Sequence, residues 1–547
     1  MKEHIAYFSM EVAVSEDIPT YAGGLGVLAG DTLRSFADLE VPVVGITLLY
    51  KKGYFHQVID ENGNQVEKEV NWKPEDKLKK LPVEVSVYIK DREVKVTAWQ
   101  YKIKGVTGFK NKLLFLDTDI DGNTEYDRKI TQSLYANNDE YRLFQEIVLG
   151  IGGVKIIESL EYNEIQRYHM NEGHSAPLVL ELAKTLTKEE IREKCVFTTH
   201  TPVAAGHDCF PKELAKELLG QHLPDELSES IFKDSGLNMT YIGFEFSGHI
   251  NGVAKKHGQV SREMFPGYNI EAITNGVHTY FWTNEVFSEL FDKYLTGWQY
   301  DPFCLRYALS IPKEEIWKTH EKAKENLIDY VNEHHDAKMD KDVFTIGFAR
   351  RMTPYKRGEL FFSDIERVKK IAKNTGRLQI IFGGKAHPKD SEGKKIIKKI
   401  LEYKSQLKDF IKVCYVHDYS IEEAKMLVSG VDLWLNTPKK PMEASGTSGM
   451  KAAHNGVPQF SVLDGWWLEG HLEGITGWSI GAHPDEDEKE SNEVEDLYSK
   501  LEYVILPLFY DNRSGWIDVM RNSISINASF FNTHRMVQQY VLNAYYN

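Results

Sequence analysis

Lys451 stands in the segment Pro441-Met-Glu-Ala-Ser-Gly-Thr-Ser-Gly-Met-Lys451, where small and polar residues run directly into a predicted short helix. We expect Asn455, Gly456 and Pro458 to end that helix. Free backbone N–H groups and the positive end of the dipole at a helix start favour an anion. A lysine in the first helical turn is unfavourable there unless an anion or a chemical change of the amine compensates, and Schiff-base formation is such a change. Taken alone, the segment fits an exposed loop with an ordinary surface lysine equally well.

A predicted strand at 343–349 is followed by four basic residues, Arg350, Arg351, Lys356 and Arg357. These residues leave the sheet at the carboxyl edge of a parallel strand, where ligands bind in open α/β sheets. Arginine offers a planar fork for phosphate and lysine a point charge, so the group suits two neighbouring phosphates. Without further context, a solvated basic loop explains the group equally well.

A glycine-rich segment, Tyr21-Ala-Gly-Gly-Leu-Gly-Val27, precedes a helical stretch near the N-terminus. Closely spaced glycines allow main-chain amides to approach an oxyanion. On its own the pattern is weak, because such loops are often only turns.

The bulk composition is that of an ordinary soluble globular protein. The chain has 547 residues, of which 42% are hydrophobic and 27% charged, and its net charge is −15. This length predicts two large domains. The negative charge argues against nucleic acid or an anionic membrane as a partner, so an anionic substrate requires a local basic pocket.

The cysteines are scattered along the chain without a CxxC pair. Cys195, Cys209, Cys304 and Cys414 therefore indicate neither a disulfide framework nor a zinc site. The N-terminal residues 1–10 lack the apolar stretch of a signal peptide, and no stretch approaches a membrane span of about 18 apolar residues. We expect a cytoplasmic protein.

Short apolar runs alternate with amphipathic stretches, which is typical of parallel strands joined by crossover helices. The predicted strands are 4–9, 41–49, 167–171, 196–200 and 271–275 in the first half, and 343–349, 378–383, 412–416, 431–436 and 458–462 in the second. The alternating stretches 83–90 and 93–104 predict a β-hairpin inserted into the first domain. We expect two doubly wound, Rossmann-like domains, at 1–300 and 301–547, with a terminal helical stretch at 518–546.

Several further motifs occur in a fixed order along nearly the whole chain. They are Gly23-Gly-Leu-Gly26, Asn171-Glu-Gly-His174, Thr199-His-Thr-Pro202, Asn251-Gly-Val-Ala254, Thr274-Asn-Gly-Val277, Arg350-Arg-Met-Thr-Pro-Tyr-Lys-Arg357, Gly383-Gly-Lys-Ala386 and Glu443-Ala-Ser-Gly-Thr-Ser-Gly-Met-Lys451. In these motifs the sequence resembles a short form of the α-glucan phosphorylases, which act on glycogen, starch and maltodextrin. The resemblance implies the GT-B fold, with two α/β domains facing a central cleft and the final helix packing back on the first domain. It also implies reversible phosphorolysis of an α-1,4-glucan from its non-reducing end to α-D-glucose 1-phosphate, with retention of configuration.

The resemblance further implies the cofactor pyridoxal 5′-phosphate, whose 5′-phosphate assists the reaction. The residues that it assigns to the cofactor are Lys451, Arg350, Thr447, Ser448, Tyr419 and Trp282. Those that it assigns to the substrate phosphate and the sugar are Arg351, Lys356, Gly24, Glu443, Ser445, Gly446 and Asn275. His200 resembles a histidine whose main-chain carbonyl lies near the anomeric carbon. Arg351, Lys356, His200 and Lys451 are thus the expected catalytic residues, and no metal is expected.

The sequence departs from larger family members at two motifs. Glu172 and Gly173 stand where those members have Asp and Thr, and Thr447-Ser-Gly449 replaces the commoner Thr-Gly-Asn. The expected partners are an α-1,4-glucan or maltodextrin, inorganic phosphate and, if the protein forms a homo-oligomer, a second copy. Three other classes remain to be distinguished by experiment: a sugar-nucleotide glucan synthase, a glycosidase using Glu443 with an acid such as Glu172, and a non-catalytic glucan-binding module.

Overall fold

The computed structural model describes residues 3–135, 138–223, 231–233, 236–335, 337–486 and 490–546. The chain divides into two compact units. Unit 1 comprises residues 1–55, 69–274 and 533–547, and unit 2 comprises 56–68 and 275–532. The expected domain boundary near residue 300 therefore falls inside unit 2.

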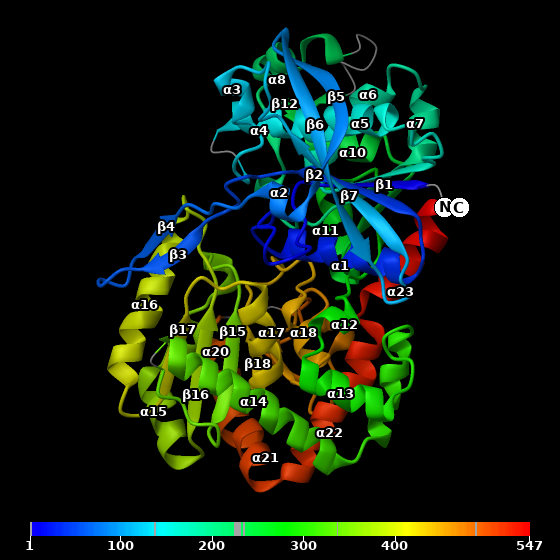
Figure 1. The fold of residues 1–547 in the computed structure, drawn as a ribbon. Helices are drawn as coiled ribbons and strands as arrows, with labels where there is room; N and C mark the ends of the chain where they lie inside the picture. The colour runs from blue at the N-terminus through cyan, green and yellow to red at the C-terminus, as the bar shows by residue number, and fades with distance from the viewer. Residues whose placement is uncertain are drawn as a thin grey trace. The chain divides into compact units, whose positions relative to one another are not determined.

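Unit 1 is built on a nine-stranded sheet (Figure 1). In sheet order its strands are β14 (Glu271–Ala272), β13 (His249–Gly252), β9 (Cys195–Thr198), β8 (Arg167–Asn171), β1 (Ile5–Ser9), β2 (Val43–Leu48), β7 (Lys110–Asp117), β6 (Arg92–Lys104) and β5 (Lys79–Ile89). The strands from β14 to β7 pair in parallel. The predicted hairpin is β5–β6, and β6 pairs antiparallel with β7, so the hairpin extends the sheet.

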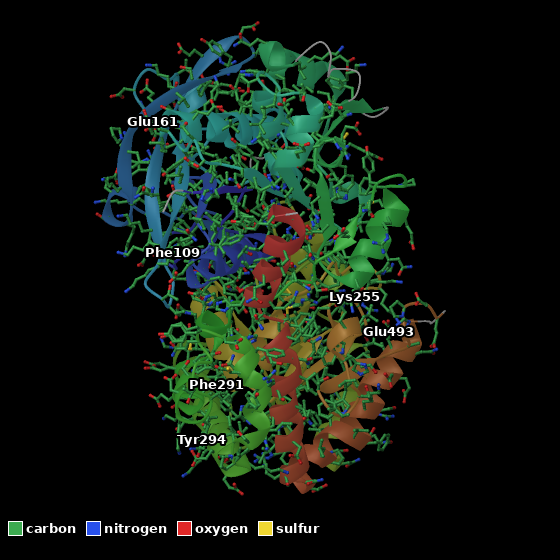
Figure 2. The ribbon with its side chains drawn as sticks, turned by 90° about the vertical axis from the view of Figure 1, so that its right-hand side faces the viewer. Phe109, Glu161, Lys255, Phe291, Tyr294 and Glu493 are labelled. Carbon is green, nitrogen blue, oxygen red and sulfur yellow. The ribbon has the colours of Figure 1, made fainter. Side chains whose placement is uncertain are left out.

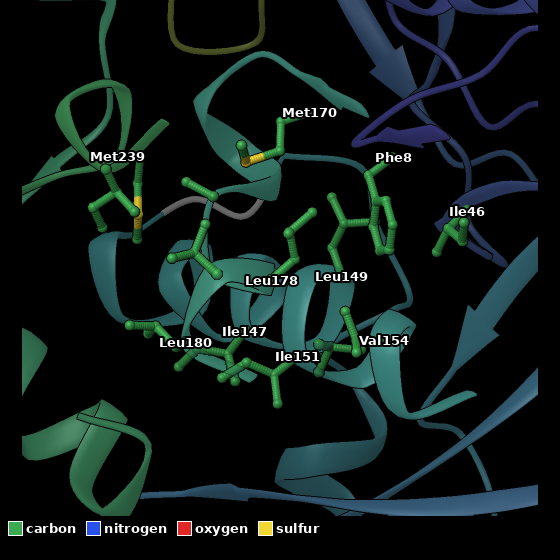
Figure 3. Close-up of a cluster of buried hydrophobic side chains, with 14 of the residues drawn as sticks. Phe8, Ile46, Ile147, Leu149, Ile151, Val154, Met170, Leu178, Leu180 and Met239 are labelled. Atoms are coloured by element: carbon green, nitrogen blue, oxygen red, sulfur yellow. The ribbon is translucent and has the colours of Figure 1, made fainter. Parts of the chain in front are cut away.

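Both faces of this sheet are covered by helices, as in a doubly wound domain. One face packs against α4 (Asp139–Ile147), η1 (Val148–Gly152) and α5 (Gly153–Ser159), with Phe8, Ile46, Leu149 and Met170 in the shared core (Figure 3). The other face packs against α1 (Gly24–Asp38) and the C-terminal α23 (Thr533–Tyr540) and η10 (Val541–Tyr545). The terminal helix thus belongs to the core of unit 1.

The remaining described elements of unit 1 surround the sheet. They are α2 (Pro74–Lys77), α3 (Glu125–Arg128), η2 (Gly173–Ser175), α6 (Leu178–Leu182), α7 (Lys188–Lys194), η3 (Ala204–Gly206), β10 (Cys209–Phe210), α8 (Lys212–Leu219), η4 (Gly220–His222), β11 (Phe232–Lys233), β12 (Gly236–Asn238), α10 (Met239–Glu245) and α11 (Lys255–Met264).

Unit 2 contains a six-stranded, wholly parallel sheet. In sheet order its strands are β17 (Lys412–Val416), β16 (Leu378–Gly383), β15 (Phe344–Ala349), β18 (Leu433–Asn436), β19 (Gln459–Val462) and β20 (Gly477–Ile480). All six strands are almost completely buried, and most of their positions hold apolar or small residues. The hairpin of β3 (His56–Ile59) and β4 (Gln65–Lys68) also belongs to this unit.

Helices cover both faces of the second sheet as well. One face packs against α14 (Lys313–His335), α17 (Ile421–Gly430) and α18 (Ser448–Ala453). The other packs against α15 (Ile365–Asn374), α16 (Ser391–Leu407), α20 (Glu490–Lys500), α21 (Leu506–Asp511) and α22 (Arg513–Asn522). This core continues into α13 (Glu285–Tyr294), where Phe291 is fully buried and Tyr294 packs against the same cluster (Figure 2).

Shorter elements complete unit 2. They are α12 (Thr279–Trp282), η5 (Pro302–Ser310), η6 (Pro354–Lys356), η7 (Leu360–Phe362), α19 (Trp467–Gly470), η8 (Leu501–Ile505) and η9 (Ser523–Ala528). Across the described ranges, no helix has both the length and the apolar character that crossing a membrane requires.

Candidate active site

The basic residues after β15 lie where the strand ends, as predicted. The amide of Arg350 donates to the carbonyl of Gly383 at 3.1 Å, which ties the start of the basic segment to the end of β16. Gly384 has a φ of 133°, and a Cβ there would lie 1.8 Å from the carbonyl oxygen of Arg350, so this crossing needs a glycine. The side chains of Arg350 and Lys356 are more than nine-tenths buried, whereas Arg351 is exposed.

Glu443 joins two of these cations. Its Oε2 accepts hydrogen bonds from Arg350 Nη2 and Lys356 Nζ, both at 2.5 Å. Burial by itself raises the pKa of the Glu443 carboxyl, but the charges and hydrogen bonds of Arg350 and Lys356 outweigh it and lower the pKa to about 2. Glu443 is therefore ionised at neutral pH.

The loop that contains Glu443 is held by a second turn after β19. Asp464 accepts a hydrogen bond from the Glu443 amide at 2.9 Å, and the Trp466 amide donates to the carbonyl of Ser445 at 2.9 Å. Gly465 between them has a φ of 55°, and a Cβ there would lie 2.3 Å from the Ser445 carbonyl oxygen. These contacts fix residues 443–446 against the sheet edge.

Asp464 is a buried acid that is not among the predicted site residues. Burial raises its pKa, the amides of Glu443 and Gly465 lower it, and the negative charge of Glu443 raises it again, to about 7. An acidic residue followed by glycine directly after a parallel strand is the signal that could have identified it.

A small pocket in unit 2 brings five of the predicted site residues together. Its lining comprises Arg350, Asn436, Pro438, Glu443, Ser445, Gly446, Ser448, Gln459, Ser461, Asp464 and Trp466. Arg350 Nη1, Asn436 Oδ1 and Gln459 Oε1 are buried polar atoms that have no hydrogen-bond partner among the described residues. Such groups are costly to bury unless something satisfies them, so the pocket suits a polar or anionic ligand.

Lys451 lies in α18, which ends at Ala453 as predicted and is followed by Gly456 with a φ of 68°. The expectation that Lys451 occupies the first turn is only partly right, because it is the fourth of six residues and its own amide donates to the Thr447 carbonyl. The amine therefore lies beyond the free amides of the helix start. The lysine is buried, and its Nζ lies 3.8 Å from the centre of the Trp282 ring.

Other predicted cofactor residues lie around the same strand ends. Ser448 accepts a hydrogen bond from the indole of Trp434 at 3.0 Å, and Thr447 precedes α18 without capping it through its side chain. Tyr419 packs on Gly383, where a Cβ would lie 2.9 Å from its ring. Asn455 holds Trp282 to α18 by donating to the Trp282 carbonyl at 2.8 Å.

Asn275, assigned to the sugar by resemblance, is buried. It precedes Gly276, where a Cβ would lie 2.2 Å from the backbone of Asn532. Asn275 is not among the residues that line the small pocket.

Gly24 and His200 belong to unit 1, at the carboxyl edge of its sheet. Gly24 is the first residue of α1, and His200 follows β9. The His200 amide donates to Glu172 Oε2 at 2.7 Å, and its Nε2 lies 2.6 Å from Asn171 Oδ1. Burial, with the neighbouring His257 and His174, lowers the pKa of His200 to about 3, so its ring is neutral at pH 7.

Glu172 is fully engaged in shaping this edge. Its Oε2 also accepts from the Thr201 hydroxyl at 2.9 Å, and its Oε1 accepts from the Gly173 amide at 3.0 Å. The residue has a φ of 78°, which is uncommon for a residue with a side chain. This network holds the His200 segment and leaves Glu172 poorly suited to serve as a free catalytic acid.

Comparisons with known proteins identify relatives along nearly the entire chain. The family model described as carbohydrate phosphorylase matches residues 10–145 and 225–472. The chain is 40% identical to the maltodextrin phosphorylase of Thermococcus litoralis, over 99% of this chain and 70% of that protein. It is 34% identical to the glycogen phosphorylase of Aquifex aeolicus, over 100% and 86% of the two chains, and 34% identical to an uncharacterised protein of Methanocaldococcus jannaschii, over 99% of each. With this coverage and this order of motifs, the chain belongs to the carbohydrate phosphorylase family.

Proposed function

We propose that the protein catalyses reversible phosphorolysis of an α-1,4-glucan, such as maltodextrin or glycogen, from the non-reducing end to α-D-glucose 1-phosphate. Family membership supports the reaction class. The observation that carries the proposal is that two buried cations, Arg350 and Lys356, both donate to Glu443, which lines the small polar pocket together with Arg350. A protein of net charge −15 needs such a local positive site to hold phosphate.

We propose that pyridoxal 5′-phosphate is the cofactor and that unit 2 binds it. The residues fit this group, because a buried lysine packs on Trp282 and the pocket presents Arg350 Nη1 without a partner among the described residues. Lys451 would hold the pyridoxal, with Trp282 and Tyr419 beside it, and Arg350, Thr447 and Ser448 would contact its phosphate end. When bound, the cofactor supplies a phosphate group that assists proton transfer to the leaving glycosidic oxygen.

The proposed reaction breaks the bond between the anomeric carbon and the glycosidic oxygen. That oxygen receives a proton and leaves as the 4-hydroxyl of the shortened chain, while an oxygen of inorganic phosphate bonds to the anomeric carbon on the same face. Arg351 and Lys356 would orient the phosphate and offset its charge, together with the loop at Gly24. The carbonyl of His200 would face the positive charge that develops on the sugar.

Glu443 would change partners during substrate binding. In the structure its carboxylate forms ion pairs with both Arg350 and Lys356. When a bound phosphate also pairs with these cations, the carboxylate would become available to accept a hydrogen bond from a hydroxyl of the glucose unit. Ser445, Gly446 and Asn275 would bind other hydroxyls of the same sugar. The same group would thus balance the cations before binding and recognise glucose afterwards.

The geometry disfavours the two-carboxylate glycosidase. An acid catalyst must be protonated, whereas Glu443 has a pKa of about 2, and both oxygens of Glu172 accept hydrogen bonds. We also propose a cytoplasmic location, which suits the free thiols of Cys195, Cys209, Cys304 and Cys414.

Product analysis tests the proposed function. The purified protein is incubated with maltodextrin in buffer with and without phosphate, and glucose 1-phosphate and glucose are quantified. We expect glucose 1-phosphate only when phosphate is present. Free glucose in phosphate-free buffer would indicate a glycosidase. Elongation of maltodextrin by ADP-glucose or UDP-glucose would indicate a synthase, and binding without turnover would indicate a glucan-binding module.

A further inference from the structure

Glu11 is a buried carboxylate that holds the glycine-rich loop of unit 1. It lies two residues beyond β1 and is 3% exposed. Its Oε2 accepts hydrogen bonds from the amides of Ala22 at 2.6 Å and Gly23 at 3.1 Å. Its Oε1 accepts a hydrogen bond from the Tyr135 hydroxyl at 2.6 Å. Three donors therefore satisfy this charge in the protein interior.

The first two turns of α1 pack unusually closely on the segment that carries Glu11. The Ala13 amide donates to the Gly26 carbonyl at 2.9 Å. A Cβ on Gly26 would lie 2.8 Å from Glu11 Oε2, and a Cβ on Gly30 would lie 1.9 Å from the Ala13 carbonyl oxygen. Because Gly26 and Gly30 are four residues apart, they lie on one face of α1 and allow this approach. Glu11 and the start of α1 thus form one fixed unit.

This arrangement divides the amides of the glycine loop into two sets. Ala22 and Gly23 direct their N–H groups to Glu11, whereas the following amides belong to the first turn of α1, where no intrahelical acceptor is available. Gly23, at the helix N-cap, has no side chain that could cap these amides, and Gly24 is exposed. A Cβ on Gly23 or Gly24 would meet no atom within 4 Å, so open space adjoins this part of the loop.

We propose that Glu11 is a positioning residue for phosphorolysis: its carboxylate anchors the amides of Ala22 and Gly23 so that the first-turn amides from Gly24 onwards are aimed at the substrate phosphate. The inference rests on the proposed function. Glu11 itself does not touch the phosphate. A loop that is already ordered loses less conformational entropy when the anion binds, so the anchor should act mainly on phosphate affinity.

The anchor works through hydrogen-bond geometry, and a glutamine at the same position separates geometry from charge. In Glu11→Gln, the side-chain carbonyl oxygen can still accept from Ala22 and Gly23, and the side-chain NH₂ can donate to Tyr135, whose hydroxyl then acts as acceptor. In Glu11→Ala, the anchor is lost and two amides are left to find other partners. Glu11→Gln should therefore keep the loop anchored for phosphate binding, whereas Glu11→Ala should not.

The experiment measures initial rates of glucose 1-phosphate formation while phosphate and maltodextrin are varied separately, together with Tm and pyridoxal content. Asp117→Ala is the matched control, because Asp117 is also a buried carboxylate of unit 1 and accepts from the Asp119 amide and the Trp99 indole. We expect Glu11→Ala to raise KM for phosphate by about tenfold, the effect of losing roughly one to two hydrogen bonds, with a much smaller change in KM for maltodextrin. The KM for phosphate of Glu11→Gln should stay within about twofold of the parent's value. Asp117→Ala should lower Tm and leave KM for phosphate unchanged.

The inference is overturned if Glu11→Ala keeps the parent's KM for phosphate, or if its KM values for phosphate and for maltodextrin rise equally. It is also overturned if Glu11→Gln raises KM for phosphate as much as Glu11→Ala does. If Glu11→Ala does not fold, Tyr135→Phe replaces it, because it removes one donor and keeps the loop contacts. We then expect KM for phosphate to rise by about two- to threefold, and an unchanged value contradicts the inference. A parent protein that forms no glucose 1-phosphate refutes the proposed function instead, so the two failures are distinguishable.

Discussion

The ammonium nitrogen of Lys356 lies 2.5 Å from Oε2 of Glu443, on the oxygen that also accepts from Arg350. All three side chains are about nine-tenths buried. Removing the charge of Glu443 leaves two buried cations without this shared partner, which is more costly than losing a surface ion pair. The group therefore affects both stability and local charge at the place where we propose that phosphate binds.

Glu443→Gln should make the protein less sensitive to acid. The pKa of Glu443 is lowered from 4.5 to about 2 in the folded protein, so its ionised form stabilises the fold above pH 4.5, and this contribution disappears as pH falls from 4.5 towards 2. The Tm of the variant should lie below that of the parent at pH 7, and the difference should shrink as pH falls below 4.5. Calorimetry across this pH range measures the difference in Tm between the variant and the parent. Glu125→Gln is the control, because Glu125 forms an exposed ion pair with Lys129. A difference in Tm that grows at low pH would show that Glu443 is not held ionised.

Asp464→Asn should alter the pH dependence of phosphate binding. The folded-state pKa of Asp464 is raised from 3.8 to about 7, so the folded protein binds the extra proton between these values, and the stability contributed by this group falls as pH rises from about 4 to 7. Above pH 7 the ionised Asp464 adds negative charge beside Glu443 and should weaken the binding of phosphate. We expect KM for phosphate to rise less between pH 6.5 and 8 in Asp464→Asn than in the parent. Because the titration of free phosphate affects both proteins equally, parallel profiles would rule out this role.

Lys451 should be the residue that carries the pyridoxal group. Its amine is buried and packs on the Trp282 ring, and a lysine amine is the group that bonds to pyridoxal. Borohydride reduction followed by peptide mass mapping should find a pyridoxyl adduct on Lys451. Lys425, whose Nζ lies 4.2 Å from the Phe281 ring centre in the same unit, provides the matched control. Lys425→Ala should retain the adduct and the characteristic absorbance, whereas Lys451→Ala should lose both. An adduct on another lysine would disprove the assignment.

Three predicted strands, β8, β16 and β17, have the bounds that the structure gives. In β16 and β17 every position except Lys412 is buried, because helices cover both faces of the sheet, and most of the residues are therefore apolar. β13 and β20 were missed, since His249–Gly252 and Gly477–Ile480 mix small, polar and apolar residues and are too short to show a period. β14 has only two residues of the predicted five.

The placement of β3 and β4 could not be predicted from local pattern. These strands lie between segments of unit 1 in the sequence, yet the Gln57 amide donates to Asp418 and Gln65 donates to the Ala386 carbonyl. Such contacts join residues more than 300 positions apart. The local residue preferences of 56–68 therefore give no information about these contacts.

Two of the segments that carry predicted site residues lie together in the structure. The basic segment at Arg350 and the loop at Glu443 converge on one pocket, as their positions after strands indicated. Glu11 and Asp464 were not found, because each is a single acid whose role depends on backbone amides that the fold brings to it. A sequence shows the acid but not the amide that approaches it.

The phosphate dependence of glucose 1-phosphate formation tests the central claim most directly. Initial rates from maltodextrin are measured over a wide range of phosphate for the parent and for Lys356→Met, which keeps much of the side-chain volume and removes the charge. The account predicts saturable, strictly phosphate-dependent product in the parent, and a higher KM for phosphate with slower turnover in Lys356→Met at normal pyridoxal content. Sugar release that is independent of phosphate, or a Lys356→Met protein with the phosphate response of the parent, would contradict it.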